Sequence, residues 1–328
     1  MIAREFRGRQ IKTGAARADA VVIGMGRGLT LFLGLCLAAG CSVKKMAVNK
    51  LGDALAQSGP TFASDDDPEL VKAAVPFALK LMESLLAESP EHEGLLFATS
   101  SGFTQYAFAF VQQEADELEE HDHSAAQAMR QRARRLYLRA RNYGLRGLES
   151  RHRGFSEALQ GDPRRALRNT RKSDVPLLYW TAVSWGAAIS VLKDDPDLIA
   201  DVAVVEALID RALALEADFD HGAIYTFLIG YELSRQGAEG DAEARARAHF
   251  ERAMELSGGQ QAGPLVALAE AVSVQNQDVT EFQELLNQAL AIDPDARPEW
   301  RLVNLIMQQR AAWLLARTED LFLLPQDE

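Results

Sequence analysis

Cysteine is almost absent from this chain. Its 328 residues include only Cys36 and Cys41, which stand close together near the start. If the segment before Cys41 is removed as a signal and Cys41 itself is modified, the rest has no free thiol, no disulfide and no cysteine metal site. Its stability must then come from packing of the chain.

Alternating polar and apolar runs, which are typical of half-buried strands, are also missing. Ala and Leu are abundant and runs of β-branched residues are few, a balance that favours helix over sheet. Hydrophobic residues make up 48% of the chain, enough for one large core or two smaller ones. We therefore predict an all-α fold.

Positive charge is scarce beyond residue 40. The whole chain carries a formal net charge of −12, and its first forty residues hold six Lys or Arg against two acidic residues. The remainder has 29 positive and 45 negative side chains, a net charge of −16. Such acidity argues against general nucleic-acid binding and does not help contact with anionic lipid. A link to a membrane would have to be covalent.

The N-terminal region has the pattern of a secretory signal. Leu29–Ala39 reads LTLFLGLCLAA, which is too short to span a bilayer, since that takes about 20 residues. Arg27 supplies the charged flank of such a signal. Met25 offers an alternative start that would give a more compact leader.

Small residues precede Cys41, and this arrangement resembles a lipobox. The usual pattern has Leu three positions before the cysteine, where this chain has Ala38. We expect residues 1–40 to be a lipoprotein signal peptide and Cys41 to be lipidated. An ordinary signal cleaved near Ala39 and a buried apolar helix are the alternatives. Ser42 follows the cysteine, which by the sorting rule of proteobacterial lipoproteins predicts the outer membrane, facing the periplasm.

The remainder is predicted to form a tether, residues 41–67, and a single helical domain, residues 68–328. Similar segments begin at Ile209, Phe250 and Leu286, spaced by 41 and 36 residues, with a weaker copy at Met82. The spacing is close to the period of about 34 residues in tetratricopeptide repeats. We predict a divergent tetratricopeptide-like helical array, with a general helical bundle as the alternative. The small residue of each copy should lie at a helix–helix contact: Ala212, Ala253 and Ala289.

Polar clusters give no sign of catalysis or metal binding. His121 and His123 stand two positions apart in an acidic run, which places them on different helix faces and favours a solvated turn. No nucleophile elbow, zinc-protease motif or phosphate loop occurs. We expect no enzyme activity, no metal and no cofactor.

A basic stretch from Arg130 to Lys172 holds fourteen Lys or Arg against three acidic residues. It is either a face that meets an acidic partner or another subunit, or a set of solvated helix faces whose arginine stems cover apolar surface.

Large aromatic residues among small ones mark a candidate ligand cleft. Trp180 and Trp185 follow Tyr179 in YWTAVSWGAAISVL, where small neighbours leave room beside the rings. Tyr225 lies in the next aromatic segment, and Asn304 lies in a mostly apolar helix where a buried amide needs a hydrogen-bond partner. A core filled by aromatic side chains is the alternative.

These segments resemble the T-component (TatT) family of tripartite ATP-independent periplasmic (TRAP) transporters. The resemblance covers nearly the whole chain after Cys41 and is most specific around Trp180 and Trp185 and from Asn304 to Phe322. It implies a lipoprotein with a degenerate tetratricopeptide-like fold. It also implies assembly as a trimer, docking of the periplasmic solute-binding subunit, and a cleft or pore for an apolar ligand.

We therefore expect a periplasm-facing lipoprotein accessory component of a TRAP transporter. A lipid-anchored scaffold for envelope assembly is the alternative, and a hydrolase with an unrecognised site is a weaker one.

Overall fold

The computed structural model describes residues 46–191, 196–235 and 239–323. Within these ranges all regular structure is helical and no strand is present, so the predicted all-α class is confirmed. The chain divides into two compact units, Met1–Lys50 and Leu51–Glu328. Cys41 and the predicted signal peptide, residues 1–40, lie outside the described residues. All the helices from Gly59 onward belong to the second unit, which begins at Leu51.

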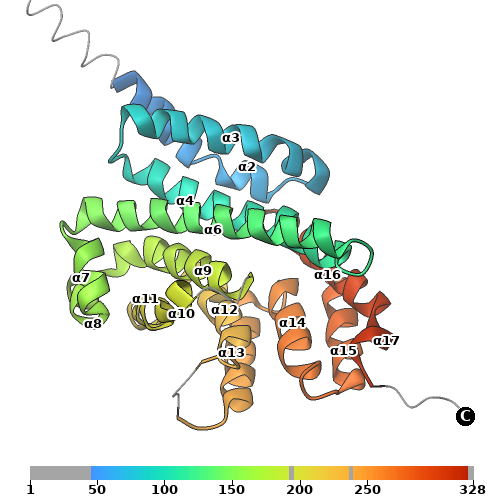
Figure 1. The fold of residues 1–328 in the computed structure, drawn as a ribbon. Coiled ribbons are helices and arrows are strands. Elements are labelled where there is room, and N and C mark those ends of the chain that lie inside the picture. Colours follow the sequence, from blue (N-terminus) through green and yellow to red (C-terminus); the bar gives the residue numbers. More distant parts are fainter. Residues whose placement is uncertain (1–45, 192–195, 236–238, 324–328) are drawn as a thin grey trace, which may run out of the picture. The chain divides into compact units, whose positions relative to one another are not determined.

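The first helices of this unit surround a shared core (Figure 1). In chain order they are α2 (Gly59–Ala63), α3 (Pro68–Glu88), α4 (Glu93–Ala107), the π-helix η1 (Phe108–Gln112), α5 (Gln113–Leu118) and α6 (His123–Arg151). Of these, α3, α4, η1 and α6 supply side chains to the core. The Asp67 carboxylate accepts a hydrogen bond of 2.9 Å from the backbone nitrogen of Leu70, and Pro68 begins α3. The boundary that the sequence predicts at residue 68 coincides with the start of α3. Phe103 and Tyr137 fill the core between α4 and α6.

A second core is centred on α9. This part of the chain forms α7 (Phe155–Gly161), α8 (Pro163–Ala166), η2 (Leu167–Asn169), η3 (Lys172–Asp174), α9 (Val175–Val191), α10 (Pro196–Ala200) and α11 (Val202–Leu215). The core itself draws on α7, α8, η2, α9 and α11, with further side chains from α6 and from the helix that follows η4 (Phe219–Gly222). Helix α9 packs against α4, α6 and α11. It is apolar on nearly every side, as expected of a helix enclosed by others. The candidate aromatic residues of the cleft on this helix therefore lie in a mostly enclosed part of the protein.

A third core follows toward the end of the chain. The elements of this part of the chain are η4 (Phe219–Gly222), α12 (Ala223–Tyr231), α13 (Ala242–Ser257), α14 (Ala262–Leu268), the π-helix η5 (Ala269–Ser273), α15 (Val279–Leu290), η6 (Pro298–Trp300), α16 (Arg301–Ala316) and α17 (Thr318–Leu321). The core is supplied by α12 to α17 without η6, and α12 also contributes to the second core. Successive helices pack on one another, α12 on α13 and α14, α14 on α15, and α15 on α16.

Helix α16 returns to the first helices of the unit. It contacts α2 and α3, and the Arg301 guanidinium donates a hydrogen bond of 2.9 Å to the Ser64 carbonyl. Residues 51–67, which the sequence pattern assigns to the tether, therefore belong to the compact unit. Among them, 51–56 and α2 are helical.

The repeated segments all fall in the C-terminal halves of helices. Ile209 lies in α11, Phe250 in α13 and Leu286 in α15, and the weaker copy at Met82 lies in α3. Their small residues are all fully buried, as expected of close helix–helix contacts: Ala212, Ala253 and Ala289.

Candidate functional site

The aromatic residues of α9 lie side by side in the second core. The rings of Tyr179 and Trp180 meet edge to face, with centroids 5.0 Å apart. Tyr179 is buried, and its hydroxyl donates a hydrogen bond of 3.4 Å to the Ala223 carbonyl at the start of α12. Trp180 is only half-buried. Helix α9 therefore presents one enclosed and one accessible ring at the same place.

Trp185 lies further along α9 beneath an arginine of α6. The Arg141 guanidinium is 4.7 Å from the centroid of the indole ring, and burial lowers the pKa of Arg141. Trp185 is 4% exposed, yet its indole N–H has no acceptor among the residues that the structure describes. Most buried polar groups are hydrogen-bonded, so this donor is a point where a ligand or water molecule would be stabilised.

The other two predicted residues make their described contacts on other helices. The Tyr225 ring on α12 is 5.7 Å from the His249 ring on α13. Asn304 on α16 is 1% exposed, and its amide is bound to the backbone of Gln260 and Ala262. The structure thus brings Tyr179, Trp180 and Trp185 into one core cluster, whereas Tyr225 and Asn304 are not members of it.

A left-handed turn that sequence reasoning did not single out lies against this cluster. Asp220 and His221 have φ values of 44° and 52°, and Gly222 follows with a φ of 99°. Non-glycine residues rarely adopt this conformation, and it concentrates at functional sites. The Phe219 ring is 5.3 Å from the Tyr179 ring, and burial raises the pKa of Asp220. The Asp-His-Gly sequence was the only local signal.

One arginine of α16 joins α5, the helix that continues η1, to the π-helix η5. The Arg310 guanidinium lies 3.1 Å from a carboxylate oxygen of Asp116, just after η1, and 2.6 Å from Glu270 within η5. Burial raises the pKa of Glu270, although Arg310 opposes that rise. The Trp313 ring lies between two guanidinium groups, with Arg310 4.4 Å and Arg317 4.7 Å from its centroid. Because π-helices are rare and frequently mark functional sites, this cluster is a second candidate.

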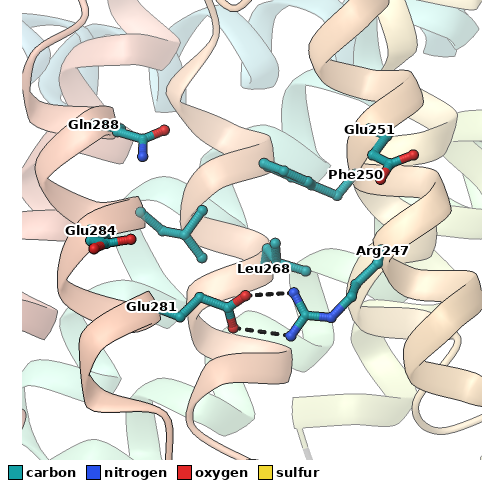
Figure 2. Close-up of a pocket in the computed structure, with 8 residues that line it drawn as sticks. Arg247, Phe250, Glu251, Leu268, Glu281, Glu284 and Gln288 are labelled. Atoms are coloured by element: carbon teal, nitrogen blue, oxygen red, sulfur yellow. Dashed lines mark hydrogen bonds and ion pairs between the residues drawn. The ribbon is translucent and has the colours of Figure 1, made fainter.

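A pocket of about 250 Å³ opens between α13 and α15, over α14 (Figure 2). Arg247 and Glu281 reach toward each other across it, and Phe250 projects from the same helix as Arg247. The Glu281 carboxylate accepts hydrogen bonds from Arg247, the longer being 3.1 Å, and from the Ser273 hydroxyl at 2.7 Å. None of the five predicted cleft residues lines this pocket.

Comparison with known proteins identifies the family. The family model described as the TRAP transporter T-component matches residues 64–322. The chain belongs to this family. A protein of Treponema pallidum (strain Nichols), described only as uncharacterized, is 31% identical to it over 310 residues, which cover 89% of this chain and 96% of that protein.

The T-component match includes every element from α3 to the end of α17 and all five predicted cleft residues, whereas Cys41 precedes it. The family is one of transporter accessory proteins, not of enzymes, and membership implies association with TRAP transporter components. In the described part of this T-component, no helix has the length and apolar character that crossing a membrane requires. The same residues contain no group of three or more His, Cys, Asp or Glu placed to hold a metal ion.

Proposed function

We propose that this T-component is a lipoprotein facing the periplasm, that it docks the solute-binding subunit of a TRAP transporter, and that it receives an apolar ligand. The family match over residues 64–322 carries this proposal, because it spans the whole helical body. The proposed anchor is a lipid on Cys41, and the proposed location is the outer membrane.

The proposed architecture is a divergent tetratricopeptide-like array that assembles as a homotrimer. The repeated segments at the C-terminal ends of α11, α13 and α15 support the array, because each buries a small residue against a neighbouring helix. The trimer rests on the family resemblance.

The proposed ligand cleft lies beside α9. Three observations support it. Trp180 remains half-buried, the buried indole N–H of Trp185 has no acceptor within the described ranges, and the strained Asp220–His221 turn adjoins the Tyr179 ring. A core in which every buried donor is paired would leave no such N–H at Trp185.

The test pairs two Trp→Ala variants of the full chain. Trp180→Ala removes a ring of the proposed cleft, and Trp313→Ala removes a ring that is also half-buried but belongs to the third core. Binding of the purified solute-binding subunit is measured for each, together with the free energy of unfolding. Binding of anilinonaphthalene sulfonate, an anionic fluorophore whose aromatic rings occupy apolar sites, is measured as well.

We expect Trp180→Ala to weaken fluorophore binding while losing little stability. Trp313→Ala should bind the fluorophore as the unaltered chain does. Trp185→Ala should cost about 3–5 kcal/mol, as for other core aromatic residues. If Trp180→Ala is equally destabilised and still binds the fluorophore normally, the residues of α9 are core and the cleft is refuted. Failure of the unaltered chain to bind the solute-binding subunit would refute the docking role and favour a scaffold.

A further inference from the structure

Exposed arginines gather on the short elements between α6 and α9. They lie in the turn after α6, on α8, on η2 and just before η3. This segment follows the C-terminal end of α6 (Figure 1). All of them are exposed. We call them the arginine patch: Arg153, Arg164, Arg165, Arg168 and Arg171.

The fold holds these side chains outward. Leu159 and Leu167 are buried in the second core, and Ala166 packs against it, so the apolar side of α7, α8 and η2 faces inward. The Asp162 carboxylate accepts a hydrogen bond of 3.0 Å from the backbone nitrogen of Arg165 and thereby caps α8. Apart from Asp162, only Glu157 is acidic between residues 152 and 171. The segment therefore cannot neutralise its own charge.

The patch contrasts with the rest of the unit. No member of the patch forms an ion pair with any residue that the structure describes. Elsewhere most arginines are neutralised by carboxylates, and Arg151, directly before the patch, binds both Glu93 and Asp174. The other ion-paired arginines are Arg130, Arg139, Arg235, Arg245, Arg247, Arg252, Arg297, Arg301, Arg310 and Arg317.

We propose that the arginine patch is the surface on which a carboxylate-rich face of the solute-binding subunit docks. The inference rests on the proposed function and adds the chemistry of the contact. Guanidinium groups bind carboxylates through paired hydrogen bonds, and complementary charge speeds encounter and fixes orientation. An uncompensated positive surface on a body of net charge −16 selects a partner of opposite charge at that place.

A protein partner fits the patch better than an anionic membrane surface. None of the large exposed hydrophobic side chains lies between residues 152 and 172, so the patch has nothing to insert among lipid chains. The rest of the body is acidic, so anionic lipid repels it when the two surfaces lie within about a Debye length, which is about 8–10 Å at physiological salt.

The experiment compares two triple variants of the full chain in detergent. Arg164→Gln, Arg165→Gln and Arg168→Gln remove three charges from the patch. The matched control removes three positive charges from partly exposed ion pairs elsewhere, with Lys72→Gln, Arg252→Gln and Arg297→Gln. Affinity for the purified solute-binding subunit is measured at low and high salt. Binding to vesicles of phosphatidylcholine with phosphatidylglycerol is measured without detergent on the same variants carrying Cys41→Ala, so that no lipid anchor contributes. Melting temperatures establish that each variant is folded.

We expect the patch variant to bind the subunit at least about tenfold more weakly than the unaltered chain at low salt. Its affinity should also depend much less on salt concentration. The control variant should bind as the unaltered chain does. Equal affinity of the two variants would overturn the inference and leave the docking role intact. A patch variant that binds the subunit normally but no longer binds vesicles would also overturn it, in favour of a membrane surface. If the unaltered chain does not bind the subunit, the proposed function fails and this inference fails with it.

Discussion

The side-chain oxygen of Asn304 accepts a hydrogen bond of 3.0 Å from the backbone nitrogen of Ala262. The amide nitrogen of the same side chain donates to the Gln260 carbonyl, also at 3.0 Å. Asn304 therefore binds both sides of the loop that leads into α14. It satisfies backbone groups at the start of that helix which no intrahelical partner could reach. These contacts position α16 against α14.

Replacement of Asn304 by Ala should destabilise the protein by about 1–3 kcal/mol, because it leaves a buried backbone N–H and a carbonyl without partners. Gln309→Ala is the matched control, since Gln309 is exposed on the same helix. Denaturant unfolding measures both. Equal stability of the two variants would show that Asn304 is not a structural clamp.

Gly144 marks a close approach of three helices. A Cβ atom at this position would lie 2.2 Å from the Thr181 hydroxyl of α9 and 3.0 Å from the Ser100 hydroxyl of α4. Gly144→Ala should therefore force α6 away from its neighbours and cost about 1–3 kcal/mol. Gly161→Ala, at the end of α7, would meet no atom within 4 Å and should leave the melting temperature unchanged or slightly raised. A tolerant Gly144→Ala variant would contradict this packing.

The buried alanines of the repeated segments test the helical array. Replacing Ala212, Ala253 or Ala289 with Phe should overpack a helix–helix contact and cost on the order of 1–3 kcal/mol each. Thermal unfolding of each variant is the measurement. If all three retain the original melting temperature, these positions are not the close contacts of a repeat.

The free energy of unfolding should fall in acid, because a buried carboxylate at the end of α12 becomes protonated. Burial by itself would raise the pKa of Glu232, but hydrogen bonds from Arg245 and Arg235 outweigh it and hold that pKa below the usual value of 4.5. The native state then binds fewer protons than the unfolded state, so this contribution is present above pH 4.5 and is lost as the pH falls through the folded pKa.

Glu232→Gln should therefore be less stable than the unaltered chain at neutral pH, by about 1–3 kcal/mol, and the difference should shrink in acid. Unfolding free energies measured from neutral pH downward test this. Glu284→Gln serves as the control, because Glu284 is exposed. A difference that stays constant or grows as the pH falls would show that Glu232 is not the group responsible.

The anchor is tested by changing Cys41 to Ala in the full chain. We expect the variant to leave the membrane fraction and to incorporate no labelled fatty acid, because the covalent lipid would be its only attachment. Undiminished labelling would refute Cys41 as the acylated residue. Fractionation of the unaltered protein with the inner membrane would contradict the predicted location.

Several features of the candidate site could be read from the sequence because they are local. The aromatic and small residues of α9 are close neighbours in the chain, so their shared helix was predictable. Whether each ring faces the core or an accessible surface was not, and the structure gives different answers for Trp185 and Trp180. The placement of Asn304 against Gln260 and Ala262 depends on how α16 meets α14, which no local pattern encodes.

The sequence by itself determined the all-α class, the start of α3 at Pro68, the burial of the repeated alanines and the family, because hydrophobic periodicity, capping and motifs are written within a few turns of chain. Only the tertiary structure decided that Arg310 joins Asp116 to Glu270, that Arg141 covers Trp185, and that the arginine patch stays without acidic partners among the described residues. Such pairings join helices distant in the chain, and they follow from which faces pack together once apolar surfaces are buried.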